Sequence, residues 1–290
     1  MKFFQIMRPA HWTKSVFVFA GLVFGKKLAG AQADVVQAVA QALGAFIGFC
    51  LVSSAVYIFN DLMDIQTDKK HPDKSRRPIA SGEVSVPQAW SVLLLCFAGA
   101  LGAGVWVSSA VAWVLIGYFG LMLLYSTVLK RIMILDCVVI AVGFCLRAIA
   151  GAMAVNVEIS PWLIICTFAI CLFLGFGKRR SEIAQLSTEA QSFRSTLTEY
   201  TPELLNHMLS VTSALAIVCF LLYAMDEATV ARFGSNHLAY TTPLVLFCVF
   251  RFSSLIQIGK YSGPVQFILG DRPFQIGFIL WALSCVFIIY

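Results

Sequence analysis

Charged residues are scarce in this sequence. They make up 12% of its 290 residues, whereas hydrophobic residues make up 59% and the mean hydropathy is +0.84. A soluble domain carries roughly 25% charged residues, so the composition argues against a water-soluble protein. Apolar runs recur along the whole chain with no soluble block between them, which predicts one integral membrane domain over residues 1–290. Because the runs are long and do not alternate, we expect an all-α polytopic bundle and not a membrane barrel.

The spacings that mark disulfide, zinc or redox sites are also missing. The sequence has nine cysteines but no CxxC pair and no Cys/His cluster of zinc spacing, and all nine lie within apolar runs. We interpret them as small apolar residues of membrane helices. The four histidines show no ligand spacing, and no nucleic-acid motif is present. Nucleic acid is therefore not an expected partner.

Nine apolar segments approach or exceed the minimum of about 17–20 residues that a membrane-crossing helix needs. The predicted transmembrane helices are residues 15–33, 35–58, 88–108, 110–128, 134–154, 161–177, 205–224, 240–257 and 274–290. The stretch 84–129 has no charged residue and is too long for one crossing, so we place a turn near Ser108 and Ser109. The N-terminal segment lacks a convincing signal-peptide cleavage site, and we expect it to stay as the first helix.

The basic residues predict the orientation. With the N-terminus inside, the inner segments hold 16 of the 21 lysines and arginines, and the outer segments hold three. This bias follows the positive-inside rule. It predicts a multi-pass protein of the inner (plasma) membrane, with the N-terminus cytoplasmic and the C-terminus outside.

The strongest chemical signal is the run AVYIFNDLMDIQTDKKHPDKSRRPIASG at positions 55–82. Asn60, Asp61, Asp64 and Asp68 form the pattern N-D-x-x-D-x-x-x-D, and the i, i+3, i+7 spacing puts the acids on one helical face. Three carboxylates on one face repel each other unless a cation lies among them. Hard oxygen ligands suit Mg²⁺, which shares its shell with substrate phosphates. A solvated helix end with capping acids is disfavoured because the face begins inside an apolar span.

Cations follow the acids directly. Lys74, Arg76 and Arg77 lie close enough in sequence to neutralise a metal-bound diphosphate, and arginine offers paired donors to phosphate oxygens. Basic residues that merely hold the loop inside are the alternative interpretation. For Arg76 the two interpretations are equal, and we assign Lys74 and Arg77 to substrate binding.

The run 60–82 resembles the first Asp-rich motif of the UbiA superfamily of intramembrane prenyltransferases. The resemblance covers essentially the whole chain and implies nine transmembrane helices with two Asp-rich motifs on cytoplasmic loops. The second motif departs from the pattern. It reads GFGKRRSEIAQL, where Lys178, Arg179 and Arg180 replace acids and Glu182 is the remaining carboxylate.

This departure resembles one branch of the superfamily, the decaprenyl-phosphate phosphoribosyltransferases. Other segments similar to that branch are RPAHWTKS at 8–15, YSTVLKRIMILD at 125–136, FCLRAIAGAMAV at 144–155 and DRP at 271–273. The branch implies magnesium-dependent transfer of 5-phosphoribose from phosphoribosyl diphosphate to a membrane polyprenyl phosphate. Three anionic groups then meet in one pocket, so its cations must outnumber its acids. An aromatic prenyltransferase of the 4-hydroxybenzoate polyprenyltransferase type, with a polyprenyl diphosphate donor, is the alternative. A transporter is disfavoured because nearly all charge lies at one face.

These considerations predict a set of site residues. The substrate-binding residues are Lys14, Lys74, Arg77, Tyr125, Lys130, Arg147, Lys178, Arg179 and Glu182; the metal ligands are Asn60, Asp61, Asp64 and Asp68; the catalytic residues are Asp61, Asp64 and Lys14. Lys130 taken alone is equally well explained as topogenic charge.

Three charged residues in or beside the apolar spans are not assigned to one role. Arg251, in the eighth predicted span, has no partner that the sequence indicates. Arg147 is expected to pair with Asp136 or to contact a phosphate. Asp271 is expected either to close the site or to cap the last helix.

The attacking phosphate is already ionised at pH 7, so no general base is required.

Overall fold

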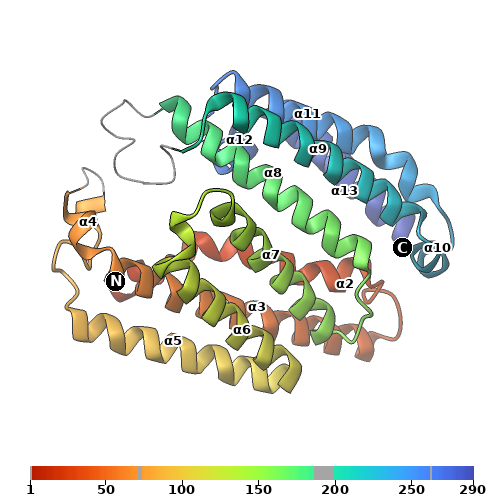
Figure 1. The fold of residues 1–290 in the computed structure, drawn as a ribbon. Helices are drawn as coiled ribbons and strands as arrows, with labels where there is room; N and C mark the ends of the chain where they lie inside the picture. The colour runs from red at the N-terminus through yellow and green to blue at the C-terminus, as the bar shows by residue number, and fades with distance from the viewer. Residues whose placement is uncertain (1, 71–73, 186–198, 262) are drawn as a thin grey trace. The chain divides into compact units, whose positions relative to one another are not determined.

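The computed structural model describes residues 2–70, 74–185, 199–261 and 263–290. These residues form helices joined by short connections, as Figure 1 shows. The helices are α1 (Lys2–Ile6), η1 (Pro9–Phe19), α2 (Ala20–Phe24), α3 (Gln32–Met63), α4 (Ile65–Lys70), η2 (Lys74–Arg76), α5 (Val86–Val107), α6 (Ser109–Thr127), η3 (Leu129–Arg131), α7 (Leu135–Ala154), α8 (Pro161–Gln185), α9 (Pro202–Met225), α10 (Glu227–Phe233), η6 (His237–Thr241), α11 (Thr242–Gln257), α12 (Pro264–Gly270) and α13 (Arg272–Ile289).

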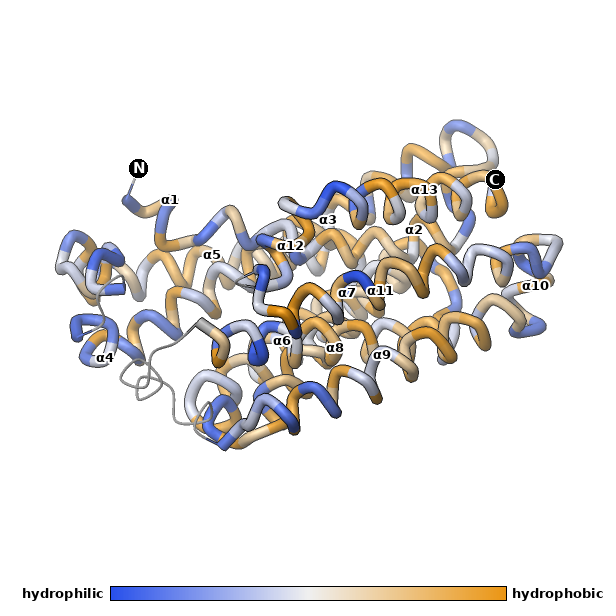
Figure 2. Tube along the Cα trace, turned by 90° about the horizontal axis from the view of Figure 1, so that it is seen from above, coloured by the Kyte–Doolittle hydropathy of each residue, from blue (hydrophilic) through white to orange (hydrophobic). Residues whose placement is uncertain are grey.

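Within the described part of the chain, eight helices are long and apolar enough to cross a membrane. They coincide with the second to ninth predicted spans, which confirms an all-α, multi-pass membrane protein. Large hydrophobic side chains remain exposed, including Leu95 at 73% and Phe287 at 87%. Figure 2 shows the long helices as mostly hydrophobic and α4 as mostly hydrophilic. Lipid is the solvent that such exposed side chains require.

The first predicted span differs from a regular α-helix. Residues 15–33 fall in η1, α2, the turn that follows and the first two residues of α3, and Lys26 in the turn has φ of 56°. The eleven residues of η1 are wound as a 3₁₀-helix, whose rise is about 2.0 Å per residue. Together with the five residues of α2 they extend about 30 Å, which matches the hydrocarbon thickness. This segment is not among the eight described helices that are long and apolar enough to cross a membrane, so the first of the nine predicted crossings stays a prediction.

The predicted turn between the third and fourth spans is confirmed. Helix α5 ends at Val107, and Ser108 adopts an extended conformation with φ of −170° and ψ of 156°. The Ser108 hydroxyl then accepts a hydrogen bond of 3.2 Å from the Val111 amide and caps α6. A capping serine satisfies an amide that the first helical turn otherwise leaves without a partner.

The chain divides into two compact units, which we describe separately. The first unit comprises Met1–Ile132 and Gly143–Glu158, and the second comprises Met133–Val142 and Ile159–Tyr290. Helix α7 contributes residues to both. In the first unit α3 packs against α5, α6 and η1. In the second unit α8 packs against α9, and α11 packs against α9 and α13. The single membrane domain over 1–290 stays a prediction.

Close backbone contacts fix η1 and α2 against α7 within the first unit. A Cβ atom added to Gly151 would lie 1.8 Å from the carbonyl oxygen of Val18, and one added to Gly21 would lie 2.6 Å from the backbone of Ala152. On the other side, the Trp12 indole donates a 3.0 Å hydrogen bond to Ser54 of α3. The segment that carries Lys14 is therefore held between α3 and α7.

Candidate active site

The acidic motif lies where α3 ends and α4 begins. Helix α3 carries Asn60 and Asp61 in its last turn and ends at Met63. Asp64 leaves the helical conformation with φ of −97° and ψ of 8°, although its carbonyl still accepts a 2.8 Å bond from the Asp68 amide. This break means that the three acids do not continue along one straight helical face.

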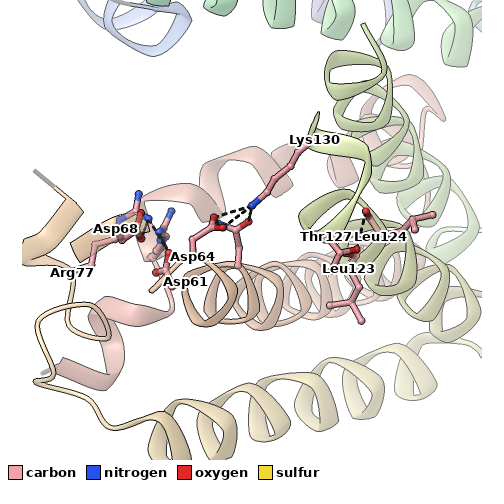
Figure 3. Close-up of polar contacts among 10 residues, drawn as sticks. Asp61, Asp64, Asp68, Arg77, Leu123, Leu124, Thr127 and Lys130 are labelled. Carbon is pink, nitrogen blue, oxygen red and sulfur yellow. Dashed lines mark hydrogen bonds and ion pairs between the residues drawn. The ribbon is translucent and has the colours of Figure 1, made fainter. Parts of the chain in front are cut away.

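Asp61 and Asp68 share one arginine. Nη1 of Arg77 lies 3.0 Å from Oδ1 of Asp61 and 2.7 Å from Oδ2 of Asp68. Figure 3 shows the three side chains together. Asp61 also forms an ion pair with Arg8. Both carboxylates are buried, whereas the two arginines are part-exposed. The guanidinium of Arg77 therefore occupies the space between two carboxylates that repel each other.

Asp64 belongs to a second group. Nζ of Lys130 lies 2.9 Å from both carboxylate oxygens of Asp64 and 3.4 Å from the amide oxygen of Asn60. The Asn60 amide in turn donates a 3.0 Å bond to Asp64. Lys130 lies in η3, which follows α6 in the chain. At the end of α6, the Thr127 hydroxyl donates a 3.0 Å hydrogen bond to the Leu123 carbonyl (Figure 3). The structure thus brings Lys130 together with the acids.

The predicted set of four metal ligands does not form one cluster. Among the described residues, no group of three or more Asp, Glu, His and Cys side chains is placed to hold a metal ion. Their contacts divide them into two groups: Asp61 and Asp68 contact Arg77, whereas Asn60 and Asp64 contact Lys130. The donors still suit magnesium, which commonly takes one or two protein carboxylates and completes its shell with water and phosphate. Which of them bind the metal stays a prediction.

Lys14 lies on η1, deeper along α3 than the acids. Its Nζ is 3.5 Å from the Tyr57 hydroxyl and 5.9 Å from the centroid of the Tyr57 ring. Arg8 lies over the same ring at 5.3 Å while it pairs with Asp61. Sequence reasoning missed Arg8 and Tyr57. The available signal was position: Tyr57 is one turn before Asp61 on the same helical face.

Arg147 of α7 is 4% exposed. Its hydrogen bonds in the structure go to neutral oxygens. These acceptors are the Gly143 carbonyl at 2.8 Å, the Tyr118 hydroxyl at 2.7 Å and the Ser53 hydroxyl at 3.1 Å. Asp136, which was the expected alternative partner of Arg147, accepts hydrogen bonds from Arg179 and Tyr200 in the second unit. Sequence reasoning missed Ser53 and Tyr118.

Lys74 and Tyr125 complete the predicted residues of this unit. Lys74 begins η2, and its carbonyl accepts a 3.0 Å bond from the Arg77 amide. Tyr125 lies in the last two turns of α6, five residues before Lys130. Both side chains are half-buried. Their assignment to substrate binding stays a prediction.

In the second unit, Arg179 of α8 is buried between two acids. Its Nε lies 2.8 Å from Asp136, and its Nη1 lies 2.7 Å from Glu182. Lys178 is exposed and lies 3.8 Å from Glu182. Burial of Arg179 is compensated by these carboxylate partners. Substrate binding by Lys178, Arg179 and Glu182 stays a prediction.

Tyr200 extends this network. Its hydroxyl donates a 2.9 Å bond to Asp136 and accepts a 2.7 Å bond from the amide of Ile134. Burial raises the pKa of the Tyr200 hydroxyl, and the nearby Cys137 and Asp136 act in the same direction. Ile134 has φ of 69°, which is unusual for a β-branched residue. The hydrogen bond that the Ile134 amide donates to Tyr200 helps to hold that strained backbone.

Asp271 caps the last helix, which was one of its two expected roles. Its Oδ1 accepts a 2.9 Å bond from the Phe274 amide at the start of α13. Arg251, which the sequence left without a partner, forms two hydrogen bonds to the same carboxylate at 3.0 and 2.9 Å. The hydrogen bonding from Arg251 lowers the pKa of Asp271.

The fold is that of an intramembrane UbiA homologue. The chain matches the structure of a UbiA homolog from Archaeoglobus fulgidus bound to GPP and Mg²⁺, with a TM-score of 0.75 and 18% identity over 100% of this chain and 99% of that one. Residues 16–279 match the sequence profile of the UbiA prenyltransferase family. The chain therefore belongs to the UbiA prenyltransferase family and is a membrane transferase.

Two relatives are similar over nearly their full length. A decaprenyl-phosphate phosphoribosyltransferase from Mycolicibacterium smegmatis is 30% identical, over 96% of this chain and 89% of the relative. A decaprenyl-phosphate phosphoribosyltransferase from Corynebacterium glutamicum is 28% identical, over 99% and 86%. The predicted branch of the superfamily is thus the one to which these relatives belong.

Proposed function

We propose that this protein transfers 5-phosphoribose from 5-phosphoribosyl-1-diphosphate to a membrane polyprenyl phosphate, such as decaprenyl phosphate, and releases diphosphate. The observation that carries the proposal is the near full-length similarity to the two decaprenyl-phosphate phosphoribosyltransferases. The first unit supports it, because Arg8, Arg77 and Lys130 bring cations to the acidic motif. A reaction between two phosphorylated substrates needs cations at its site.

Magnesium is the expected cofactor. Asn60, Asp61, Asp64 and Asp68 offer the hard oxygen donors that would hold it together with the substrate diphosphate. When bound, the ion stabilises the negative charge of the leaving diphosphate. Arg77 and Lys130 now balance the acids, and their N–H donors suit phosphate oxygens as well as carboxylates. Substrate binding would let these side chains exchange one anionic partner for the other.

The chemistry requires one bond to break and one to form. The bond between C1 of the ribose and the diphosphate oxygen breaks, and the diphosphate leaves with the electron pair. An oxygen of the polyprenyl phosphate forms the new bond to C1, and in-line attack inverts that carbon. The attacking oxygen is already ionised, so the protein acts by positioning the two anions and stabilising charge. We assign Asp61, Asp64 and Lys14 to this role.

An aromatic prenyltransferase with a polyprenyl diphosphate donor is the alternative. A transfer assay separates the two reactions. Purified protein receives radiolabelled phosphoribosyl diphosphate, decaprenyl phosphate and Mg²⁺, and label is expected in the lipid fraction. Asp64→Ala is expected to abolish the transfer, and Lys260→Gln, at an exposed lysine of the second unit, is expected to leave it unchanged. Prenylation of 4-hydroxybenzoate without phosphoribose transfer would contradict the proposal.

We propose further that the protein lies in the plasma membrane with its N-terminus cytoplasmic and its C-terminus outside. The basis is the excess of lysine and arginine in the predicted inner segments. Reporter fusions at the two termini test this orientation. A cytoplasmic signal from a C-terminal fusion would contradict it.

A further inference from the structure

A buried cation without an acidic partner lies inside the first unit. The guanidinium of Arg147 forms its hydrogen bonds with a carbonyl and two hydroxyls, and its Nε has no hydrogen-bond partner in the structure. Among the described residues, no ion pair includes Arg147. The contrast with Arg179 is direct, since that equally buried arginine has two carboxylate partners.

Burial of an uncompensated charge inside a membrane helix is costly, and such residues usually serve a ligand. Aromatic rings stabilise part of the charge, because the guanidinium carbon lies 4.7 Å from the centroid of Tyr118 and 5.1 Å from that of Phe144. Rings do not neutralise the charge. A bound anion would neutralise the charge of the guanidinium.

Lys14 provides a second cation beside Arg147. Arg147 donates to Ser53 of α3, and Lys14 reaches Tyr57, which is one turn further along the same helix. Residues four apart on a helix lie about 6 Å from each other on one face. None of the ion pairs among the described residues includes Lys14. Two positive charges therefore meet here with hydroxyl groups and with no acid paired to either.

Two places along α3 suit two different kinds of anion: one at Asp61 and Asp64, and one at Ser53 and Tyr57. Asp61 lies one turn beyond Tyr57 and about 12 Å along the helix axis from Ser53. At Asp61 and Asp64 the cations are paired with carboxylates, which suits a magnesium-bound diphosphate. At Ser53 and Tyr57, Arg147 and Lys14 contact neutral oxygens and form no ion pair among the described residues, which suits an anion that carries no metal.

We propose that Arg147 and Lys14, with the hydroxyls of Ser53, Tyr57 and Tyr118, form a metal-independent binding site for a phosphate monoester. A monoester carries between one and two negative charges at pH 7 and three acceptor oxygens, which matches two cations and three hydroxyls. This inference rests on the proposed function, in which both substrates carry such a group: the 5-phosphate of the donor and the phosphate of the lipid acceptor.

Direct binding without magnesium tests the site. Full-length protein in detergent and EDTA is titrated calorimetrically with ribose 5-phosphate and, separately, with farnesyl phosphate; ribose and farnesol serve as probes without phosphate. We expect at least one monoester to bind and its unphosphorylated counterpart not to bind. Arg147→Gln is expected to raise the Kd by about tenfold or more, because a charge-assisted contact is lost. Lys260→Gln is expected to bind like the native protein.

A variant of the acid site separates binding at the two sites. Asp64→Ala is expected to keep monoester binding within about twofold, since distant sites act independently. Ribose 5-phosphate binding that depends on Arg147 assigns the site to the donor, and farnesyl phosphate binding assigns it to the acceptor. Binding of neither monoester by the native protein, or an unchanged Kd in Arg147→Gln, overturns the site.

Folding of the variants is checked by gel filtration and thermal melting. If Arg147→Gln does not fold, Lys14→Gln on η1 carries the same test and must show the same selective loss. Loss of thermal stability with an unchanged Kd would identify a purely structural arginine and overturn the proposal. Failure of phosphoribose transfer alongside Arg147-dependent monoester binding would contradict the proposed function and still support the site.

Discussion

Nζ of Lys130 lies 2.9 Å from both carboxylate oxygens of Asp64, a residue 66 positions earlier in the chain. The contact joins the connection after α6 to the end of α3. It shows that the acidic motif is balanced by the protein's own cations within the first unit. A substrate that brings phosphate and metal therefore meets acids and cations already arranged together.

Replacement of Lys130 by Gln should weaken use of the diphosphate substrate. Loss of a charged donor to Asp64 and to substrate phosphate typically removes about 1.5–3 kcal/mol, so kcat/KM should fall by about 10- to 100-fold. Arg131→Gln is the matched control, because that neighbouring residue of η3 is exposed. It should change kcat/KM by less than about threefold. Equal losses in the two variants would contradict a specific role for Lys130.

Replacement of Asp61 by Asn should destabilise the first unit. It leaves Arg8 and Arg77 without the buried carboxylate that both contact. Because both arginines are partly exposed, we expect a loss of about 1–3 kcal/mol, below the range for a fully buried pair. Thermal melting in detergent measures the change. Glu83→Gln, which removes an exposed partner of Lys2, should leave the melting temperature almost unchanged.

Removal of the divalent metal should stop phosphoribose transfer without stopping monoester binding. The acids at 60–68 would then lack the ion that links them to diphosphate, whereas no ion pair within the described part of the chain joins an acid to Arg147 or Lys14. Transfer is measured in EDTA and again after Mg²⁺ is restored, and monoester binding is measured in parallel. Transfer that persists in EDTA would contradict the magnesium assignment.

Gly151→Ala should lower stability by forcing η1 away from α7. The added Cβ would lie 1.8 Å from the backbone oxygen of Val18, which has no rotamer to change. Overpacking of this kind costs about 1–3 kcal/mol, and displacement of η1 should also weaken any function of Lys14. Gly120→Ala in α6 is the control, since no atom lies within 4 Å of the added Cβ. It should be neutral or slightly stabilising.

Asp271→Ala should destabilise α13 more than Asp271→Asn, because asparagine keeps a capping oxygen for Phe274. The expected loss for alanine is about 1 kcal/mol. The folded-state pKa of Asp271 is lowered, so the charge stabilises the protein above the unfolded pKa of about 3.9 and this contribution disappears as the pH falls through the lowered value. The melting difference between native protein and Asp271→Asn should therefore shrink only below about pH 4. A difference that vanishes near pH 6 would contradict the pairing with Arg251.

The helices were predictable because a membrane crossing is a local property. Twenty apolar residues in a row must form a helix in lipid, whatever their neighbours are, and the predicted spans from the second onward coincide with helices. The first span was harder, since it is wound as a 3₁₀-helix and has close backbone contact between Val18 and Gly151 of α7. That contact joins segments more than 130 residues apart, and no local pattern indicates it.

The sequence by itself determined the membrane fold, the acidic motif at 60–68 and the cations that follow it, because composition and helical spacing are local. Tertiary structure alone decided how the charges are paired. It separated Asp64 with Lys130 from Asp61 and Asp68 with Arg77, enclosed Arg179 with Asp136, and left Arg147 among neutral oxygens. The physical reason is that an ion pair depends on distance and burial, and both are set by the packing of segments that are remote in the chain.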